Sequence, residues 1–107
     1  MQPNAQMLDE LSQRIVETVH PLRIILFGSA ARGEMGFDSD LDVLVVMPDG
    51  IHRRKTAQKI YRHLWGLGFA KDIVVVTETD VREHGANPYM VIKAALEEGR
   101  EIYRAAG

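Results

Sequence analysis

The stretch that decides the fold is FGSAARGEMGFDSDLDVLVV, residues 27–46. Its second and third residues, Gly28 and Ser29, are small and follow an apolar run that ends at Phe27. The stretch ends in a second apolar run that begins around Asp40 and Asp42. Carboxylates placed beside a buried strand cost several kcal/mol of folding free energy unless a cation compensates them. The stretch therefore joins a glycine–serine turn to a group of acids that needs a cation.

Hydrophobic periodicity along the rest of the chain predicts alternating helices and strands. Apolar residues at helical spacing predict helices, and short β-branched apolar runs predict strands. The expected helices cover residues 5–18, 52–66 and 88–98, with a helical turn from Ser29. The expected strands cover residues 22–27, 40–47, 72–77 and, at an edge, 101–104. The pattern of residues 78–86 is compatible with either a loop or a helical turn. This order predicts an α/β fold, a small mixed β-sheet of about four strands with helices packed on it.

The composition is that of an ordinary globular domain. The chain has 107 residues, of which 46% are hydrophobic and 26% charged, so residues 1–107 are expected to form a single domain. A net charge of -2 argues against direct binding to nucleic acid. The absence of cysteine excludes disulfides, thiolate nucleophiles and zinc–thiolate sites. With neither a signal peptide nor an apolar run of roughly 20 residues, a cytoplasmic protein without membrane contact is expected.

Asp40 and Asp42 are candidate metal ligands. In a strand, residues two apart point to the same face with Cα atoms about 6.6 Å apart, so these carboxylates can bridge divalent cations about 3.5–4 Å apart. Oxygen ligands without nearby histidine or sulfur favour Mg2+ or Mn2+ over zinc. Asp72 stands at the head of a later strand, and the three acids form one cluster if that strand neighbours the strand at 40–47. Asp38 is expected to be a solvated loop residue.

Gly28 and Ser29 are candidates for binding phosphate. Glycine lets the backbone approach a ligand closely, free N–H groups at a helix start attract phosphate, and the serine hydroxyl adds a donor. Taken alone, the pair could equally be an N-capped turn between a strand and a helix. Arg32 could contact phosphate or could neutralise the acids through a salt bridge. Beside paired acids, the turn indicates a site for a nucleoside triphosphate.

Two other motifs fail on spacing. The segment GSAARGE has the glycine spacing of a P-loop, but Glu34 and Met35 stand where a P-loop has Lys and Ser or Thr. The alternating aspartates resemble the start of an EF-hand loop, but Val43 replaces the required glycine and Asp49 the closing glutamate. Neither a Walker-type ATPase nor an EF-hand calcium site is therefore expected.

The helix expected at 52–66 carries a concentration of positive charge. Residues 51–71 contain no carboxylate and six basic residues, Arg53, Arg54, Lys55, Lys59, Arg62 and Lys71. A solvated helix face is the usual explanation for such a stripe, and an acidic partner or an RNA backbone is the alternative. Tyr61 is assigned to the apolar stripe of this helix, and Trp65 to the core or to the edge of an interface.

Together these residues resemble the minimal nucleotidyltransferase (MNT) branch of the DNA polymerase β-like superfamily. The family pattern is Gly-Ser in a strand-to-helix turn, then Asp-x-Asp, then a third Asp on a later strand. Here Gly28–Ser29, Asp40–Asp42 and Asp72 resemble these three parts. The segment GREIYR, residues 99–104, is similar to the family's closing segment. The resemblance extends over nearly the whole chain.

The resemblance implies a reaction and a role for each matching residue. The reaction would be in-line attack of a hydroxyl on the α-phosphorus of ATP, with pyrophosphate leaving. Asp40 and Asp42 would ligate both metals. Asp72 would ligate the catalytic metal and help to take the proton from the acceptor hydroxyl. Ser29 and the N–H groups after Gly28 would hold the β- and γ-phosphates.

The resemblance also implies a partner that carries the acceptor. Larger members of the superfamily place the acceptor against an additional helical domain, whereas residues 1–107 are expected to form the nucleotidyltransferase domain alone. In the MNT branch the acceptor usually lies on a HEPN-domain protein, often a ribonuclease toxin, so the chain is expected to be an antitoxin that adenylylates its toxin. Two alternatives stay open, a non-catalytic nucleotide-binding or partner-capping subunit and a small-molecule nucleotidyltransferase completed by oligomerisation.

Overall fold

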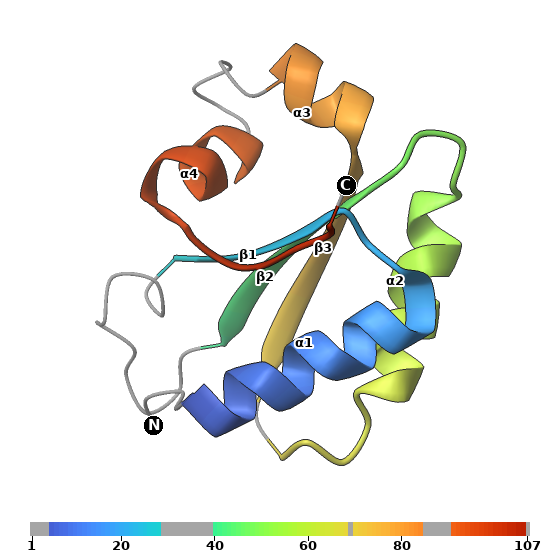
Figure 1. Cartoon of the computed structure of the whole chain (residues 1–107), viewed down its shortest axis with the longest axis vertical. Coiled ribbons are helices and arrows are strands. Elements are labelled where there is room, and N and C mark those ends of the chain that lie inside the picture. The colour runs from blue at the N-terminus through green and yellow to red at the C-terminus, as the bar shows by residue number, and fades with distance from the viewer. Residues whose placement is uncertain (1–4, 29–39, 69, 85–90, 107) are drawn as a thin grey trace.

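A computed structural model of the chain describes residues 5–28, 40–68, 70–84 and 91–106 (Figure 1). In these ranges the helices are α1 (Ala5–Val19), α2 (Arg53–His63), α3 (Glu78–His84) and α4 (Val91–Glu98). The strands are β1 (Arg23–Phe27), β2 (Leu41–Met47), β3 (Lys71–Thr77) and β4 (Arg100–Arg104). Judged by length and hydropathy, none of the described helices could span a membrane.

The strands form one mixed sheet in the order β3-β2-β1-β4. β2 runs parallel to β3, and β1 runs antiparallel to both of its neighbours, β2 and β4. A parallel pair needs a crossover connection, and α2 supplies it between β2 and β3. The predicted mixed sheet and its short edge strand are confirmed. The structure also meets the condition set for the acid cluster, because β2 and β3 are neighbours.

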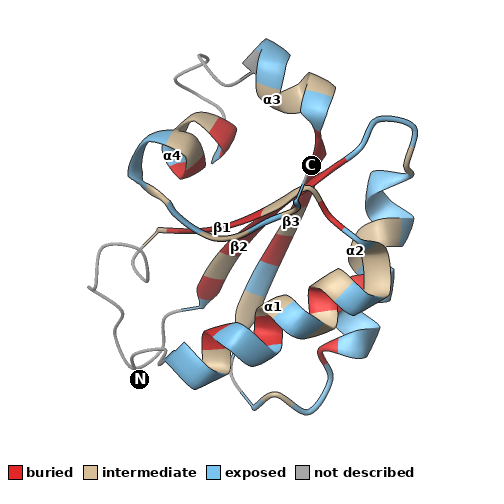
Figure 2. Cartoon of the chain, in the orientation of Figure 1, coloured by how far each residue is buried: buried red, intermediate tan, exposed pale blue. Residues whose placement is uncertain are grey.

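Helices cover both faces of the sheet, with α1 and α2 on one face and α3 and α4 on the other (Figure 1). β2 contributes side chains to the cores on both faces of the sheet. Leu41 and Val43 pack with α1 and α2, whereas Leu44 packs with α4. This explains why the strand is apolar almost throughout and buried along most of its length (Figure 2). The alternation directs Asp42, and Asp40 before it, towards the face opposite α1 and α2.

Most observed boundaries lie close to the predicted ones, and the end of α2 is the main difference. The helix ends at His63, earlier than predicted, because Leu64 already has φ -96° and ψ 0° and Gly66 has a φ of 91°. Glycine adopts positive φ without strain and commonly ends a helix. The helical turn predicted from Ser29 and the predicted start of the last helix at residue 88 lie outside the described residues.

Residues 78–84, for which the sequence allowed either a loop or a helical turn, form α3. Hydrogen bonds among polar side chains cap the start of this helix. Asp80 accepts a hydrogen bond from the Thr77 amide at 2.9 Å, and the Thr77 hydroxyl accepts one from the Asp80 amide at 3.2 Å, as in a capping box. Arg53 of α2 donates two hydrogen bonds to Asp80, at 2.6 and 2.7 Å. This bidentate pair, helped by Thr77, lowers the pKa of Asp80 from 3.8 to about 2.

Replacing Asp80 by Asn removes the charge and keeps an oxygen that can cap α3. Because the folded-state pKa of Asp80 is depressed to about 2, its stabilising effect is complete above the unfolded value of 3.8 and disappears as the pH falls towards 2. We expect Asp80→Asn to lower the free energy of unfolding by about 1–2 kcal/mol at neutral pH. Urea titrations should show the difference from wild type vanishing between roughly pH 4 and pH 2.

Glu83→Gln is the matched control, because Glu83 is an exposed acid on the same helix. Its stability should follow that of the wild type throughout the same pH range. An equal loss of stability in both variants would show that the general charge of α3, rather than the Arg53 pair, is responsible.

Candidate functional site

The pairing of β2 with β3 brings the predicted acids together. Asp42 and Asp72 lie opposite each other in the parallel register, so both side chains leave the sheet on the same face. Asp40 lies immediately before β2 and is close enough to repel the Asp42 carboxylate. The structure thus places Asp72 level with the aspartate pair. The roles of these acids as metal ligands and catalytic groups stay predictions.

Asp42 carries the clearest electrostatic perturbation in this group. Partial burial raises the pKa of Asp42 above its usual value, and repulsion by the carboxylates of Asp72 and Asp40 raises it further. Asp40 and Asp72 are themselves exposed. A cation bound between the carboxylates would relieve both the repulsion and the cost of burying charge. The cluster therefore favours binding of a cation.

The kind of ligand suits Mg2+ or Mn2+, since carboxylate oxygens are the donors that hard divalent cations prefer. In the parts of the chain that the structure describes, however, no three Asp, Glu, His or Cys side chains converge as a finished metal site. The side chains of Asp40 and Asp72 are exposed and therefore have room to rotate. The residues fit the cation in type and in backbone placement, and side-chain rotation would complete the site.

Gly28 lies directly against this cluster. It follows Phe27, which is the residue opposite Asp42 in the antiparallel register of β1 and β2. Gly28 has a φ of 72°, and a Cβ atom at this position would overlap Oδ2 of Asp42. Glycine is therefore required both by the backbone conformation and by the close approach of the carboxylate. The turn predicted to bind phosphate begins beside the acid predicted to bind metal.

Ser29 and Arg32, predicted to bind phosphate, lie outside the described residues, and so does Asp38. Their proposed contacts with a nucleotide stay predictions from the sequence.

Tyr61 is a residue of this region that the sequence pattern assigned wrongly to the apolar stripe of α2. Its side chain is 41% exposed, and its hydroxyl accepts a hydrogen bond from the Ile73 amide at 2.8 Å. The same oxygen lies 3.5 Å from Oδ1 of Asp72 and donates to it. Because β3 is an edge strand, its outward N–H groups have no neighbouring strand, and Tyr61 takes that place for Ile73. No spacing in the sequence signals this contact.

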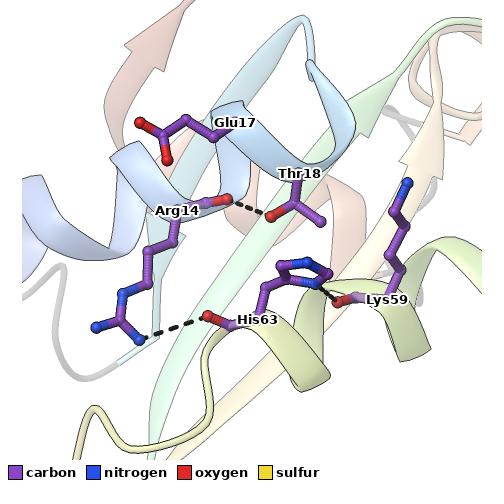
Figure 3. Close-up of a pocket in the computed structure, with 5 residues that line it drawn as sticks. All are labelled: Arg14, Glu17, Thr18, Lys59 and His63. Atoms are coloured by element: carbon purple, nitrogen blue, oxygen red, sulfur yellow. Dashed lines mark hydrogen bonds between the residues drawn. The ribbon is translucent and has the colours of Figure 1, made fainter.

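A cavity of about 300 Å³ lies between α1 and α2, on the other side of the sheet from the acids. Figure 3 shows its lining residues, Arg14, Glu17, Thr18, Lys59 and His63. Several of their polar groups are bonded to one another, because Thr18 donates to the Arg14 carbonyl at 2.6 Å and Arg14 donates to the His63 carbonyl at 3.4 Å. The cavity has charges of both signs and contains none of the acids of the cluster, so it is separate from the candidate site.

Replacing Asp42 by Asn should stabilise the protein when no metal is present. A raised folded-state pKa means that the charged carboxylate costs free energy, a cost that appears as the pH rises through that pKa and is absent well below the unfolded value. We expect Asp42→Asn to melt at a higher temperature than wild type in chelator at neutral pH, with a difference that shrinks towards acid pH. Asp9→Asn, an exposed acid on α1, is the control. A lower melting temperature would make Asp42 a structural hydrogen-bond acceptor.

Several solved structures share this fold, among them three that each cover 92% of this chain. A candidate nucleotidyltransferase from Sulfolobus solfataricus has 18% sequence identity and a TM-score of 0.64, covering 92% of this chain and 78% of that chain. A toxin–antitoxin with AMP-PNP has 20% identity and a TM-score of 0.65, covering 92% of this chain and 73% of that chain. A mutant of the toxin–antitoxin MntA–HpeT has 17% identity, the same TM-score of 0.65 and the same coverage of 92% and 73%. At these identities the likeness establishes the fold.

No curated protein matches the chain. Residues 6–102 match the family model of the nucleotidyltransferase domain. The matched region includes Gly28 and the three acids, Asp40, Asp42 and Asp72. The sheet, the acids on its neighbouring strands and the family match lead to one conclusion: this chain belongs to the nucleotidyltransferase domain family.

Proposed function

We propose that this protein is a metal-dependent nucleotidyltransferase that transfers AMP from ATP to a hydroxyl on a partner protein, a HEPN-type toxin, and so acts as an antitoxin. The observation that carries the proposal is the β2–β3 register, in which Asp42 and Asp72 share one face beside Gly28. Two structural neighbours support it: one contains AMP-PNP, and the other is a variant with two aspartates, spaced like Asp40 and Asp42, changed to glutamate.

Each residue of the cluster has a defined part in this reaction. Asp40 and Asp42 would hold two divalent cations, and Asp72 would complete the site of one of them. When bound, the cations offset the negative charge that builds on the phosphates during transfer. Gly28 lets the backbone approach the triphosphate, and Ser29 adds a hydroxyl donor. Asp72, at the strand farthest from that turn, would accept the proton of the attacking hydroxyl.

A non-catalytic subunit that only binds a partner is the main alternative. Such a protein has no need for an acid whose pKa is raised by burial and by the repulsion of two neighbouring carboxylates, because both effects cost stability without any return in function. A small-molecule transferase would keep the acids, and only the identity of the acceptor separates it from the proposal. The proposal therefore depends on finding AMP on a protein rather than on a small molecule.

The exposed side of α2 is our candidate for the surface on which the partner docks. Four exposed cations lie on this helix, none paired with a described acid; they are Arg54, Lys55, Lys59 and Arg62, and we call them the basic surface. Arg53 is already bound to Asp80 and is not one of them. Trp65, assigned to the core or an interface edge, is 85% exposed just beyond this helix, so the core assignment is wrong. An acidic protein surface would complement this charge.

The first test of the proposal concerns metal and nucleotide. Because the cations would bridge the acids and the phosphates, ATP with Mg2+ should raise the melting temperature by more than the two separate shifts added together. The double variant Asp40→Asn with Asp42→Asn should lose this synergy and stay folded. Asp9→Asn should keep it. An undiminished response to ATP and Mg2+ in the double variant would remove these acids from the binding site.

The second test separates docking from chemistry, using the HEPN-domain protein encoded beside the gene, if one is present there, as the partner. We expect reversal of Arg54, Lys55 and Arg62 to glutamate to weaken partner binding about tenfold at low salt, because exposed charges govern association and its salt dependence. The response to ATP and Mg2+ should not change. Asp72→Asn should do the opposite, leaving the complex intact and the partner unmodified. Pull-down and intact mass of both proteins measure the two effects.

Partner affinity that survives the charge reversal at low salt would show that the basic surface is only a solvated helix face. AMP found on a small molecule, with none on the partner, would favour the small-molecule transferase instead.

A further inference from the structure

The hydroxyl of Tyr61 has the surroundings of a nucleophile. Its oxygen lies 3.5 Å from Oδ1 of Asp72, to which it donates, and accepts a hydrogen bond from the Ile73 amide at 2.8 Å. A hydroxyl has one proton and two lone pairs, so the contact with Ile73 leaves one lone pair unused. The side chain is also 41% exposed. A free lone pair beside a proton acceptor is what an activated hydroxyl requires.

The order of the strands places Tyr61 on the side from which an acceptor must come. Gly28 follows β1, Asp42 lies on β2 and Asp72 on β3, so the three occupy successive strands of the sheet. Neighbouring strands are about 4.8 Å apart. With the outer phosphates at Gly28, pyrophosphate would leave on the β1 side, and in-line attack would come from the β3 side. Tyr61 reaches β3 from its outer edge.

We propose that Tyr61 is a site of self-modification, to which this protein transfers AMP from ATP. The inference rests on the proposed function of the acid cluster. A bond forms between the Tyr61 oxygen and the α-phosphorus, and the bond from that phosphorus to the oxygen bridging to the β-phosphate breaks. Pyrophosphate leaves, and the phenol proton passes to Asp72. The product is a phosphodiester between tyrosine and AMP.

Such a modification would regulate the same site. AMP on Tyr61 would fill the space beside Asp72 that the hydroxyl of a partner needs, and it would place a negative charge next to the basic surface of α2. Both effects oppose the docking and modification of a partner. A self-modified chain would therefore be inactive towards its partner until the AMP is removed.

The experiment uses the purified protein alone, with ATP and Mg2+ and without a partner. Intact mass should show one added AMP per chain, and peptide mapping should place it on Tyr61. Label in the α-phosphate of ATP should be retained, and label in the γ-phosphate should not. Because peptide mapping is done on the wild type, the assignment does not depend on a variant that folds.

Variants then test the geometry. Tyr61→Phe and Asp72→Asn should each lose the adduct. Tyr103→Phe is the matched control, because Tyr103 lies on β4 at the opposite edge of the sheet, and it should be modified like the wild type. The fraction modified per unit time should be independent of protein concentration, as expected for transfer within one molecule.

The outcomes separate this inference from the proposed function. Stabilisation of the wild type by ATP and Mg2+ without any adduct overturns self-modification and leaves the proposed function standing. An adduct that persists in Tyr61→Phe, or a rate proportional to protein concentration, overturns transfer to Tyr61 within one chain. If neither stabilisation nor an adduct is found, the proposed function fails as well.

Discussion

The parallel pairing of β2 with β3 is the constraint on which the rest of the site depends. Its register sets Asp42 opposite Asp72, two like charges on one face of the sheet, and such a pair opposes strand pairing. The pairing is held by the core, because Val43 and Ile73 pack under α1 and α2 in the same register. A slip of one residue would turn the apolar side chains of β2 to the wrong face. Hydrophobic burial thus holds together two acids that electrostatics would separate.

The antiparallel pairing of β1 with β2 places Gly28, the start of the predicted phosphate-binding turn, beside Asp42. Phe27 faces Asp42 across this ladder, so the next residue, Gly28, must pass the carboxylate closely. A nucleotide bound at Gly28 would therefore have its phosphates beside the acids. The two ladders of β2 thus set Asp42 beside Phe27, 15 residues before it in sequence, and beside Asp72, 30 residues after it.

Much of this arrangement follows from local patterns, and the rest depends on contacts that no local pattern contains. Apolar spacing and the positions of Gly and Pro predicted the helices and strands, and the alternation of residues predicted that Asp42 would leave the core face. The start of α3 has a local capping pair, Thr77 and Asp80, but no local pattern shows that Arg53, which lies 27 residues before Asp80 in sequence, also binds that carboxylate. Tyr61 resembled a core residue because helical periodicity cannot show that its hydroxyl reaches past the sheet edge to Ile73.

These two unpredicted contacts have a joint consequence for α2. Arg53, at the start of the helix, is tied to Asp80 just beyond the end of β3, and Tyr61, near the end of the helix, is tied to Ile73 near the start of β3. The helix is therefore fixed to α3 at its start and to the edge strand β3 near its end. Because one tie also contacts Asp72, a partner bound along α2 would be held at a defined position relative to the acids, which is the requirement for in-line transfer.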